Sequence, residues 1–177
     1  LNAPVGPPPV TTYLSGGIGL LIDDQNNTWT SEVQADDTAY ATSPDDLGVD
    51  PDWVEFRFLP IGLTSANIIT DVRFLVKHLE SSQLGLGGYQ NMVRCWNGSF
   101  WVDVNMYTPS FTELYYYSGN VVSCIGDSNL ANNARFLMTY EPNGTGDTIS
   151  IDYGRVDVNY LQIGSVIDLW ENQNDLP

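Results

Sequence analysis

The chain has 177 residues, which suits one domain with a sizeable core rather than two domains. Six Lys and Arg residues stand against 22 Asp and Glu residues, giving a formal net charge of −16 at pH 7, so nucleic acids and anionic membranes are excluded as favoured partners. No apolar run is long enough to span a bilayer, and an aromatic content of 12% excludes intrinsic disorder. Because only 16% of residues are charged while Asn, Ser and Thr are plentiful, we expect a protein outside the cell or on its surface.

The first 22 residues predict an extended arm. Pro7, Pro8 and Pro9 exclude a helix, and the alternation of Ile18, Leu20 and Ile22 with smaller residues predicts a strand with one bulky face. We therefore divide the chain into an arm, residues 1–22, and one β domain, residues 23–177. The arm strand either pairs within its own sheet or completes the sheet of a neighbouring subunit. For the second case the residues that donate the strand are Val10, Tyr13, Ile18, Leu20 and Ile22.

Residues 23–52 are rich in aspartate and turn-forming residues and predict mostly loop. Calcium prefers six to eight oxygen ligands on loops that wrap the ion, and this stretch supplies many carboxylates. The EF-hand pattern is absent, because residues 23–28 lack a glycine at the sixth position. The alternative is an acidic loop in solvent that binds no metal, and no other cofactor is expected. The candidate calcium ligands are Asp36, Asp37, Asp45, Asp46, Asp50 and Asp52.

From residue 53 onward, short runs of alternating apolar residues predict a series of strands. They cover residues 53–58, 72–76, 92–96, 100–104, 114–125 and 136–140, and the Asn97-Gly98-Ser99 turn predicts a hairpin. In residues 147–160 the apolar positions change phase at Gly154, which predicts either a β-bulge there or two short strands joined by a bend. With roughly eight to ten strands and almost no helix, the sequence predicts an all-β fold, an antiparallel jelly-roll sandwich.

The two cysteines, Cys95 and Cys124, both fall in predicted strands. In an oxidising compartment they would form a disulfide that closes a loop of about 30 residues; the alternative is two buried free thiols. One histidine, His78, and two distant cysteines do not make a standard zinc site, and no Gly-x-Ser-x-Gly motif accompanies that histidine. Paired carboxylates for glycoside hydrolysis exist only as they would in any acidic protein. We therefore expect no enzyme.

Two further sets of side chains point to the surface. Asn-x-Ser/Thr sequons make Asn26, Asn97 and Asn143 candidates for glycosylation, although chance alone explains such sequons in a chain this rich in Asn, Ser and Thr. Aromatic side chains would stack on sugar rings if they are exposed, and about half of them should instead lie in the core. The candidates are Trp29, Tyr40, Trp53, Tyr89, Trp96, Trp101 and Tyr115 to Tyr117.

Three segments carry a resemblance to a known family: residues 36–43 (DDTAYATS), 69–76 (ITDVRFLV) and 149–160 (ISIDYGRVDVNY). With these, residues 28–160 resemble the secreted galactose-binding-like jelly-roll domains of microbial surface proteins. The resemblance implies a two-sheet sandwich that often holds a structural calcium and serves in adhesion, sugar binding or assembly. The layout of the chain is also similar to that of extracellular filament subunits that donate a terminal strand.

Two functions follow from these observations. The first is a structural subunit of an extracellular filament or surface assembly, in which copies of the chain polymerise by donation of the N-terminal strand. Under this hypothesis, removal of the first 22 residues should leave soluble folded monomers. The alternative is a secreted carbohydrate-binding or adhesion module, braced by calcium, with glycans as partners.

Overall fold

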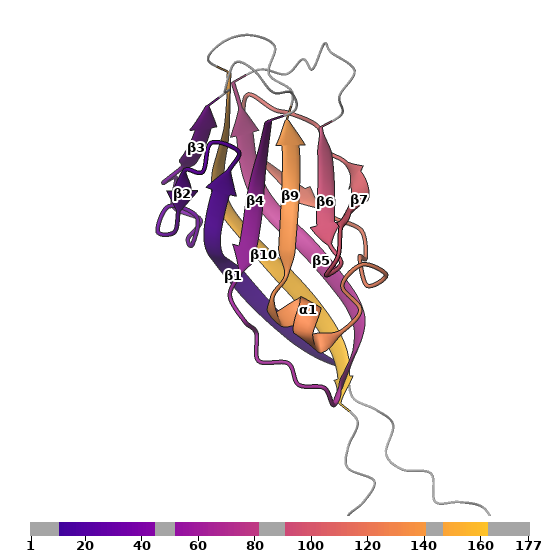
Figure 1. Ribbon diagram of the computed structural model, residues 1–177. Helices are drawn as coiled ribbons and strands as arrows, with labels where there is room; N and C mark the ends of the chain where they lie inside the picture. Colours follow the sequence, from indigo (N-terminus) through magenta and orange to yellow (C-terminus); the bar gives the residue numbers. More distant parts are fainter. Residues whose placement is uncertain (1–10, 45–51, 82–90, 141–146, 163–177) are drawn as a thin grey trace, which may run out of the picture.

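The computed structural model describes residues 11–44, 52–81, 91–140 and 147–162, and these residues form an all-β fold with one short helix (Figure 1). All strand pairings among them are antiparallel, which confirms the predicted fold class. The described elements are β1 (Thr11–Asp23), β2 (Thr28–Trp29), β3 (Ala41–Pro44), β4 (Asp52–Phe58), β5 (Asn67–Glu80), β6 (Met92–Trp96), β7 (Trp101–Met106), β8 (Leu114–Tyr117), α1 (Ser128–Asn132), β9 (Arg135–Tyr140) and β10 (Thr148–Gln162). None of the described helical segments is both long and apolar enough for a membrane span.

The strands form one strongly curled sheet in the order β7-β6-β9-β4-β1-β10-β5-β8. β1 makes the curl, because its first half pairs with β10 and its second half pairs with β4. In Figure 1, β4, β9 and β6 consequently lie in front of β10 and β5. The two halves of the sheet face each other and enclose the core as in a sandwich.

Aromatic rings fill the space between the two halves. Phe74 of β5 stacks on Phe136 of β9 with ring centroids 4.6 Å apart, and Phe56 of β4 meets Phe74 edge-on at 5.0 Å. All three rings are fully buried. Contacts of this kind stabilise the fold through burial and ring geometry together, so they hold the front and back of the curled sheet in register.

β1 differs from its predicted pattern. Ile18 and Leu21 are buried, whereas Leu20 and Ile22 are half-buried, because a shift in register between Ile18 and Leu20 changes which side chains face the core. The predicted single face of Ile18, Leu20 and Ile22 is therefore wrong. Tyr13 is exposed and its hydroxyl donates to Asp157 Oδ1 at 2.7 Å.

β1 pairs with β10 on one edge and with β4 on the other, both in its own chain. The arm strand therefore follows the alternative in which it pairs within its own sheet. Donation of this strand to a neighbour would require it to leave a central position in the sheet. Val10, the remaining residue of the predicted donor set, lies outside the described residues.

The bulge in β10 is at Asp152 rather than at Gly154. Ile151 pairs with His78 and Tyr153 with Lys77, so Asp152 is the extra residue. Gly154 faces the core instead, since a Cβ there would lie 2.7 Å from Ile18 Cδ1. The predicted position of the bulge is therefore wrong, although the segment is one continuous strand.

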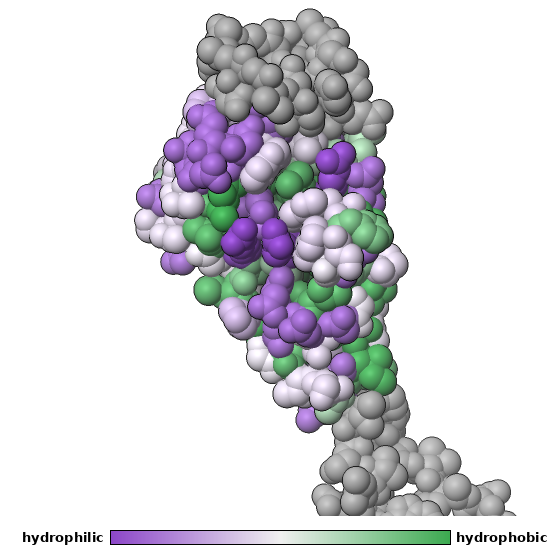
Figure 2. Space-filling view, in the orientation of Figure 1, coloured by the Kyte–Doolittle hydropathy of each residue, from purple (hydrophilic) through white to green (hydrophobic). Residues whose placement is uncertain are grey.

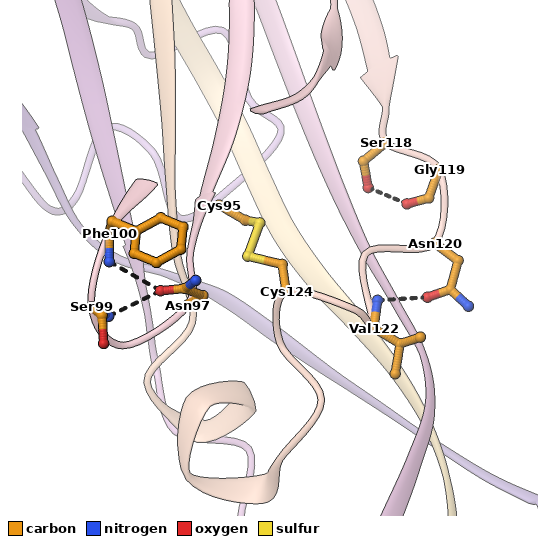
Figure 3. The surroundings of a disulfide bond; sticks show 9 residues. All are labelled: Cys95, Asn97, Ser99, Phe100, Ser118, Gly119, Asn120, Val122 and Cys124. Atoms are coloured by element: carbon orange, nitrogen blue, oxygen red, sulfur yellow. Dashed lines mark hydrogen bonds between the residues drawn. A yellow bond between two sulfur atoms is a disulfide. The ribbon is translucent and has the colours of Figure 1, made fainter. Parts of the chain in front are cut away.

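A disulfide joins Cys95 of β6 to Cys124, as predicted (Figure 3). Cys124 lies in a turn after β8 and not in a strand: its amide donates to the Val121 carbonyl at 2.8 Å. Only Leu114–Tyr117 of the predicted strand 114–125 is a strand, and α1 follows within the Asn-rich segment, capped by the Asp127 carboxylate. The bridge closes a loop across 29 positions, which stabilises the fold by roughly 3–4 kcal/mol in the chain-entropy account.

Candidate ligand-binding face

The outer side of β4, β9, β6 and β7 carries tryptophan and arginine side chains. Alternate residues of these strands, among them Val54, Phe56, Phe136 and Met138, belong to the core, so the residues between them point to the opposite side of the sheet. We call this surface the tryptophan-arginine face, and it consists of Trp53, Glu55, Arg57, Arg94, Trp96, Trp101, Asp103, Arg135, Leu137 and Thr139.

Figure 2 views the molecule from the side on which these strands lie in front. Strongly hydrophilic residues gather in the middle of that view, between paler and hydrophobic ones. The face is therefore mixed in polarity, which distinguishes it from a plain solvated surface and from an apolar docking surface.

A hollow of about 460 Å³ opens in the tryptophan-arginine face. Trp53 from β4 and Trp101 from β7 line it, and the buried side chains of Leu137 and Thr139 lie between them on β9. Glu55 and Arg94 add charged groups to the lining. A hollow of this size with aromatic walls and a few polar groups fits a small molecule or a few monomer units of a polymeric ligand.

Glu55 organises the charges beside the hollow. Its Oε1 accepts hydrogen bonds from Arg57 Nε and Arg135 Nε, both at 2.7 Å, and its side chain is only 7% exposed. Burial raises the pKa of Glu55, but the hydrogen bonds from Arg135 and Arg57 outweigh it, so the pKa lies below its usual value. Glu55 is therefore a carboxylate at neutral pH and holds both arginines in place.

Arg135 also fixes the tryptophans. Its guanidinium carbon lies 5.0 Å from the Trp96 ring centroid and 5.3 Å from that of Trp101, while the two indoles meet at 5.4 Å. Arg94 donates through Nε to Asp103 Oδ1 at 2.7 Å. Because Trp101 contacts both Arg135 and Trp96, its ring is positioned before any ligand arrives.

The candidate calcium ligands are not brought together in the described chain. Asp36 Oδ1 accepts a hydrogen bond from Lys77 Nζ at 2.7 Å, Asp37 caps the local amide of Ala39, and Asp52 is buried at the start of β4. No group of three or more metal-binding side chains occurs among the residues that the structure describes. Asp45, Asp46 and Asp50 lie outside them, and calcium binding stays a prediction.

Lys77 instead organises a polar cluster on β5, on the other half of the sheet. Its Nζ lies 2.7 Å from Asp152 Oδ2 and 2.9 Å from Glu113 Oε2, in addition to the bond with Asp36. Hydrogen bonds from Lys77 to Asp152 and Asp36 raise the Lys77 pKa well above its usual value. The bulge at Asp152 is therefore the local feature that lets its carboxylate reach this cation.

The sequons and the aromatic candidates fall in separate places. Asn26 is exposed in a turn, and Asn97 Oδ1 accepts hydrogen bonds from the amides of Ser99 and Phe100 at 3.0 Å each (Figure 3); glycosylation stays a prediction. Asn143 and Tyr89 lie outside the described residues. Among the predicted aromatics, Trp29 and Tyr40 are half-buried, Tyr116 is buried and Tyr115 and Tyr117 are exposed, whereas Trp53, Trp96 and Trp101 share one face.

The charged members of the tryptophan-arginine face were not predicted as site residues. Glu55 and Arg57 alternate with core residues in the sequence, as does Arg94 beside Cys95, so the period-2 pattern does place each on an outer face. This pattern does not show that β4, β9 and β6 are adjacent strands. The face forms only because they are adjacent.

Comparisons with solved structures find sixteen similar chains, and two of them are described here. No family model matches the sequence, and no curated protein matches it. A family 29 carbohydrate-binding module from Piromyces equi is similar with a TM-score of 0.40 and 8% identity, over 83% of this chain and 90% of that one. The C-terminal domain of a chitobiase from Bacteroides fragilis is similar with a TM-score of 0.40 and 14% identity, over 85% of this chain and 95% of that one. At these scores neither similarity assigns a function to this chain.

Proposed function

We propose that the chain is a secreted carbohydrate-binding module that holds its ligand on the tryptophan-arginine face. The observation that carries the proposal is the hollow between Trp53 and Trp101 with Leu137 beneath it. A pyranose ring presents flat C–H faces that pack on indoles and apolar side chains, while its hydroxyl groups need donors and acceptors at the edge. Arg94, Glu55 and Thr139 would meet that need.

The rigidity of the face supports binding rather than a purely structural role. Three side chains around the hollow are held by hydrogen bonds or ring contacts, namely Glu55, Arg94 and Trp101. A site that is ordered before binding loses less conformational entropy when the ligand arrives. The conformational entropy that is lost when these charged groups are held in one arrangement is consistent with contact to a ligand.

Two observations favour binding without catalysis and a location outside the cell. Among the described residues that line the hollow, the single carboxylate is Glu55, and two arginines already hold it, whereas glycoside hydrolysis requires a pair of carboxylates. The Cys95–Cys124 disulfide is typical of oxidising compartments. For strand-donated filaments we find no supporting observation in the described chain.

The proposal is tested with Trp53→Ala and Trp101→Ala. Titration with a panel of neutral and acidic oligosaccharides should give saturable binding for the wild type by calorimetry, and each variant should bind at least about tenfold more weakly, as for aromatic residues central to an interface. Tyr117→Ala is the matched control, because Tyr117 is 62% exposed on β8, away from the face. Failure of every oligosaccharide to bind, or equal affinity in all variants with native circular dichroism, would overturn the proposal.

A further inference from the structure

The tryptophan-arginine face gathers half of the positive side chains of a strongly acidic protein. The chain has six Lys and Arg residues in all, and Arg57, Arg94 and Arg135 are three of them. Two carboxylates, Glu55 and Asp103, belong to the same face. The face therefore carries more positive than negative charge, although the chain as a whole has a formal net charge of −16.

The arginines beside Glu55 are only partly neutralised. One oxygen of Glu55 accepts from both Arg57 and Arg135, so a single negative charge is shared between two positive ones. In the described part of the chain these hydrogen bonds run from Nε, and the terminal Nη nitrogens of both arginines donate to no protein group. Their side chains are 46% and 31% exposed, which leaves these donors within reach of a ligand.

Arg94 lies at the hollow itself. It lines the space between Trp53 and Trp101, and the one hydrogen bond that its side chain makes among the described residues runs from Nε to Asp103. Asp103 is 63% exposed, so water screens this ion pair and its contribution to stability is small. A ligand anion can therefore join or replace Asp103 at little cost.

The shape of the guanidinium selects among anions. Its planar fork of N–H donors matches the two oxygens of a carboxylate, which gives two parallel charge-assisted hydrogen bonds. The negative charge of the remaining molecule does not oppose such a ligand strongly, because charges more than about 8 Å away are largely screened at physiological ionic strength. The groups around the hollow thus decide the preference.

Resting on the proposed function, we infer that the ligand is an acidic oligosaccharide, whose uronate carboxylate binds Arg94 while its sugar ring packs between Trp53 and Trp101. A neutral glycan would fill the same hollow without pairing the excess positive charge. The inference therefore concerns the class of sugar and not the existence of the site.

The test compares uronate oligosaccharides with their own methyl esters, which keep the sugar ring and lose the charge. Oligomers of galacturonate, mannuronate and glucuronate are titrated into the whole chain by calorimetry, in 0.15 M NaCl with EDTA so that calcium bridges do not contribute. We expect at least one acid to bind about tenfold more tightly than its ester, in line with a charged hydrogen bond. Arg94→Gln should weaken binding of the acid by about tenfold and binding of its ester by less, because a glutamine amide can still hydrogen-bond a hydroxyl group, so that the two affinities converge.

Arg73→Gln is the control for net charge. Arg73 lies on β5, is 57% exposed and pairs with Asp71, so its loss changes the total charge equally but leaves the hollow intact. The acid should bind this variant as tightly as it binds the wild type. An equal loss of affinity in both variants would show an effect of total charge and would overturn the inference.

The other outcomes separate the inference from the proposed function. Esters or neutral glycans that bind as tightly as the acids, through Trp53 and Trp101, would overturn the inference and leave the proposed function standing. Sulfated oligosaccharides that bind as tightly as the uronates and depend equally on Arg94 would overturn the assignment of a carboxylate. If no acidic or neutral oligosaccharide binds, both the inference and the proposed function fail.

Discussion

At the scale of single residues, Glu55 links stability to the binding surface. It lies on an outer face of the sheet yet is almost fully buried, and its carboxylate accepts hydrogen bonds from Arg57 and Arg135. Its hydrogen bonds fix Arg135, and Arg135 in turn lies over Trp96 and Trp101. A change at this residue should therefore alter both folding stability and the position of the tryptophans.

Glu55→Gln should lower the free energy of unfolding by about 1–2 kcal/mol at pH 7, since a neutral acceptor makes weaker bonds to arginine than a carboxylate does. Because the pKa of Glu55 is lower in the folded chain than its ordinary value near 4.5, its charge stabilises the fold above that pH, and this contribution is lost as the pH falls further. The free energies of unfolding of wild type and variant, measured in urea, should therefore converge as the pH falls below 4.5 and through the lowered pKa of Glu55.

Asp103→Asn is the control for this measurement. It removes a carboxylate from the same face, but Asp103 is exposed, and we expect less than about 1 kcal/mol at any pH. A Glu55→Gln variant with the stability of wild type at pH 7 would contradict the role given to Glu55.

At the scale of elements, the sequence locates strands better than it locates their faces. Alternation in residues 53–58 and 136–140 corresponds closely to β4 and β9, because one side of each strand packs in the core. Bulges depend on the register with neighbouring strands. The shift in β1 and the extra residue Asp152 in β10 are set by pairing with β4 and β5, which no local pattern contains.

The candidate site shows the same limit. Trp53, Trp96 and Trp101 are recognisable as aromatic candidates in the sequence, but they become one surface only through the order β7-β6-β9-β4. Segments distant in the chain supply Arg57 and Arg135 to one carboxylate. Such a cluster follows from topology, which residue spacing alone does not determine.

Gly154→Ala tests the register of β10. An added Cβ would lie 2.7 Å from Ile18 Cδ1 and 3.3 Å from the Leu75 carbonyl oxygen, so neighbours must shift and the variant should lose about 1–3 kcal/mol of stability. Gly17→Ala, where a Cβ meets no atom within 4 Å, should change stability by less than about 0.5 kcal/mol. Equal unfolding midpoints in urea for the two variants would argue against the packing of Gly154 on Ile18.

At the scale of the whole molecule, β1 and the disulfide hold the curled sheet together. β1 is the strand through which the β10 side and the β4 side of the sheet are connected by hydrogen bonds. The disulfide joins β6, which lies near one end of the strand order, to the turn that follows β8, the strand at the other end. β1 therefore connects the two halves of the sheet in the middle of the strand order, whereas the disulfide connects the regions near its two ends, and loss of either should affect the fold as a unit.

Deletion of residues 1–22 distinguishes the two hypotheses for the N-terminal strand. Strand donation predicts a soluble folded monomer, whereas the pairing of β1 with β10 and β4 predicts an unfolded or aggregated chain. The deletion removes Ile18 and Leu21, whose burial contributes roughly 1.5–3 kcal/mol each, and exposes two strand edges. Against a total stability of about 5–15 kcal/mol, this loss should abolish the native state.

Size-exclusion chromatography and near-ultraviolet circular dichroism measure the outcome, with deletion of residues 1–10 as the control that retains all the described strands. We expect native spectra and a single monomer peak from the control, and neither from the longer deletion. A shortened chain without residues 1–22 that stays a folded monomer, and that then binds residues 1–22 of an intact second copy, would instead establish the strand as a donor. In that case β1 would be exchangeable, and the intramolecular pairing would be one of two states of the same strand.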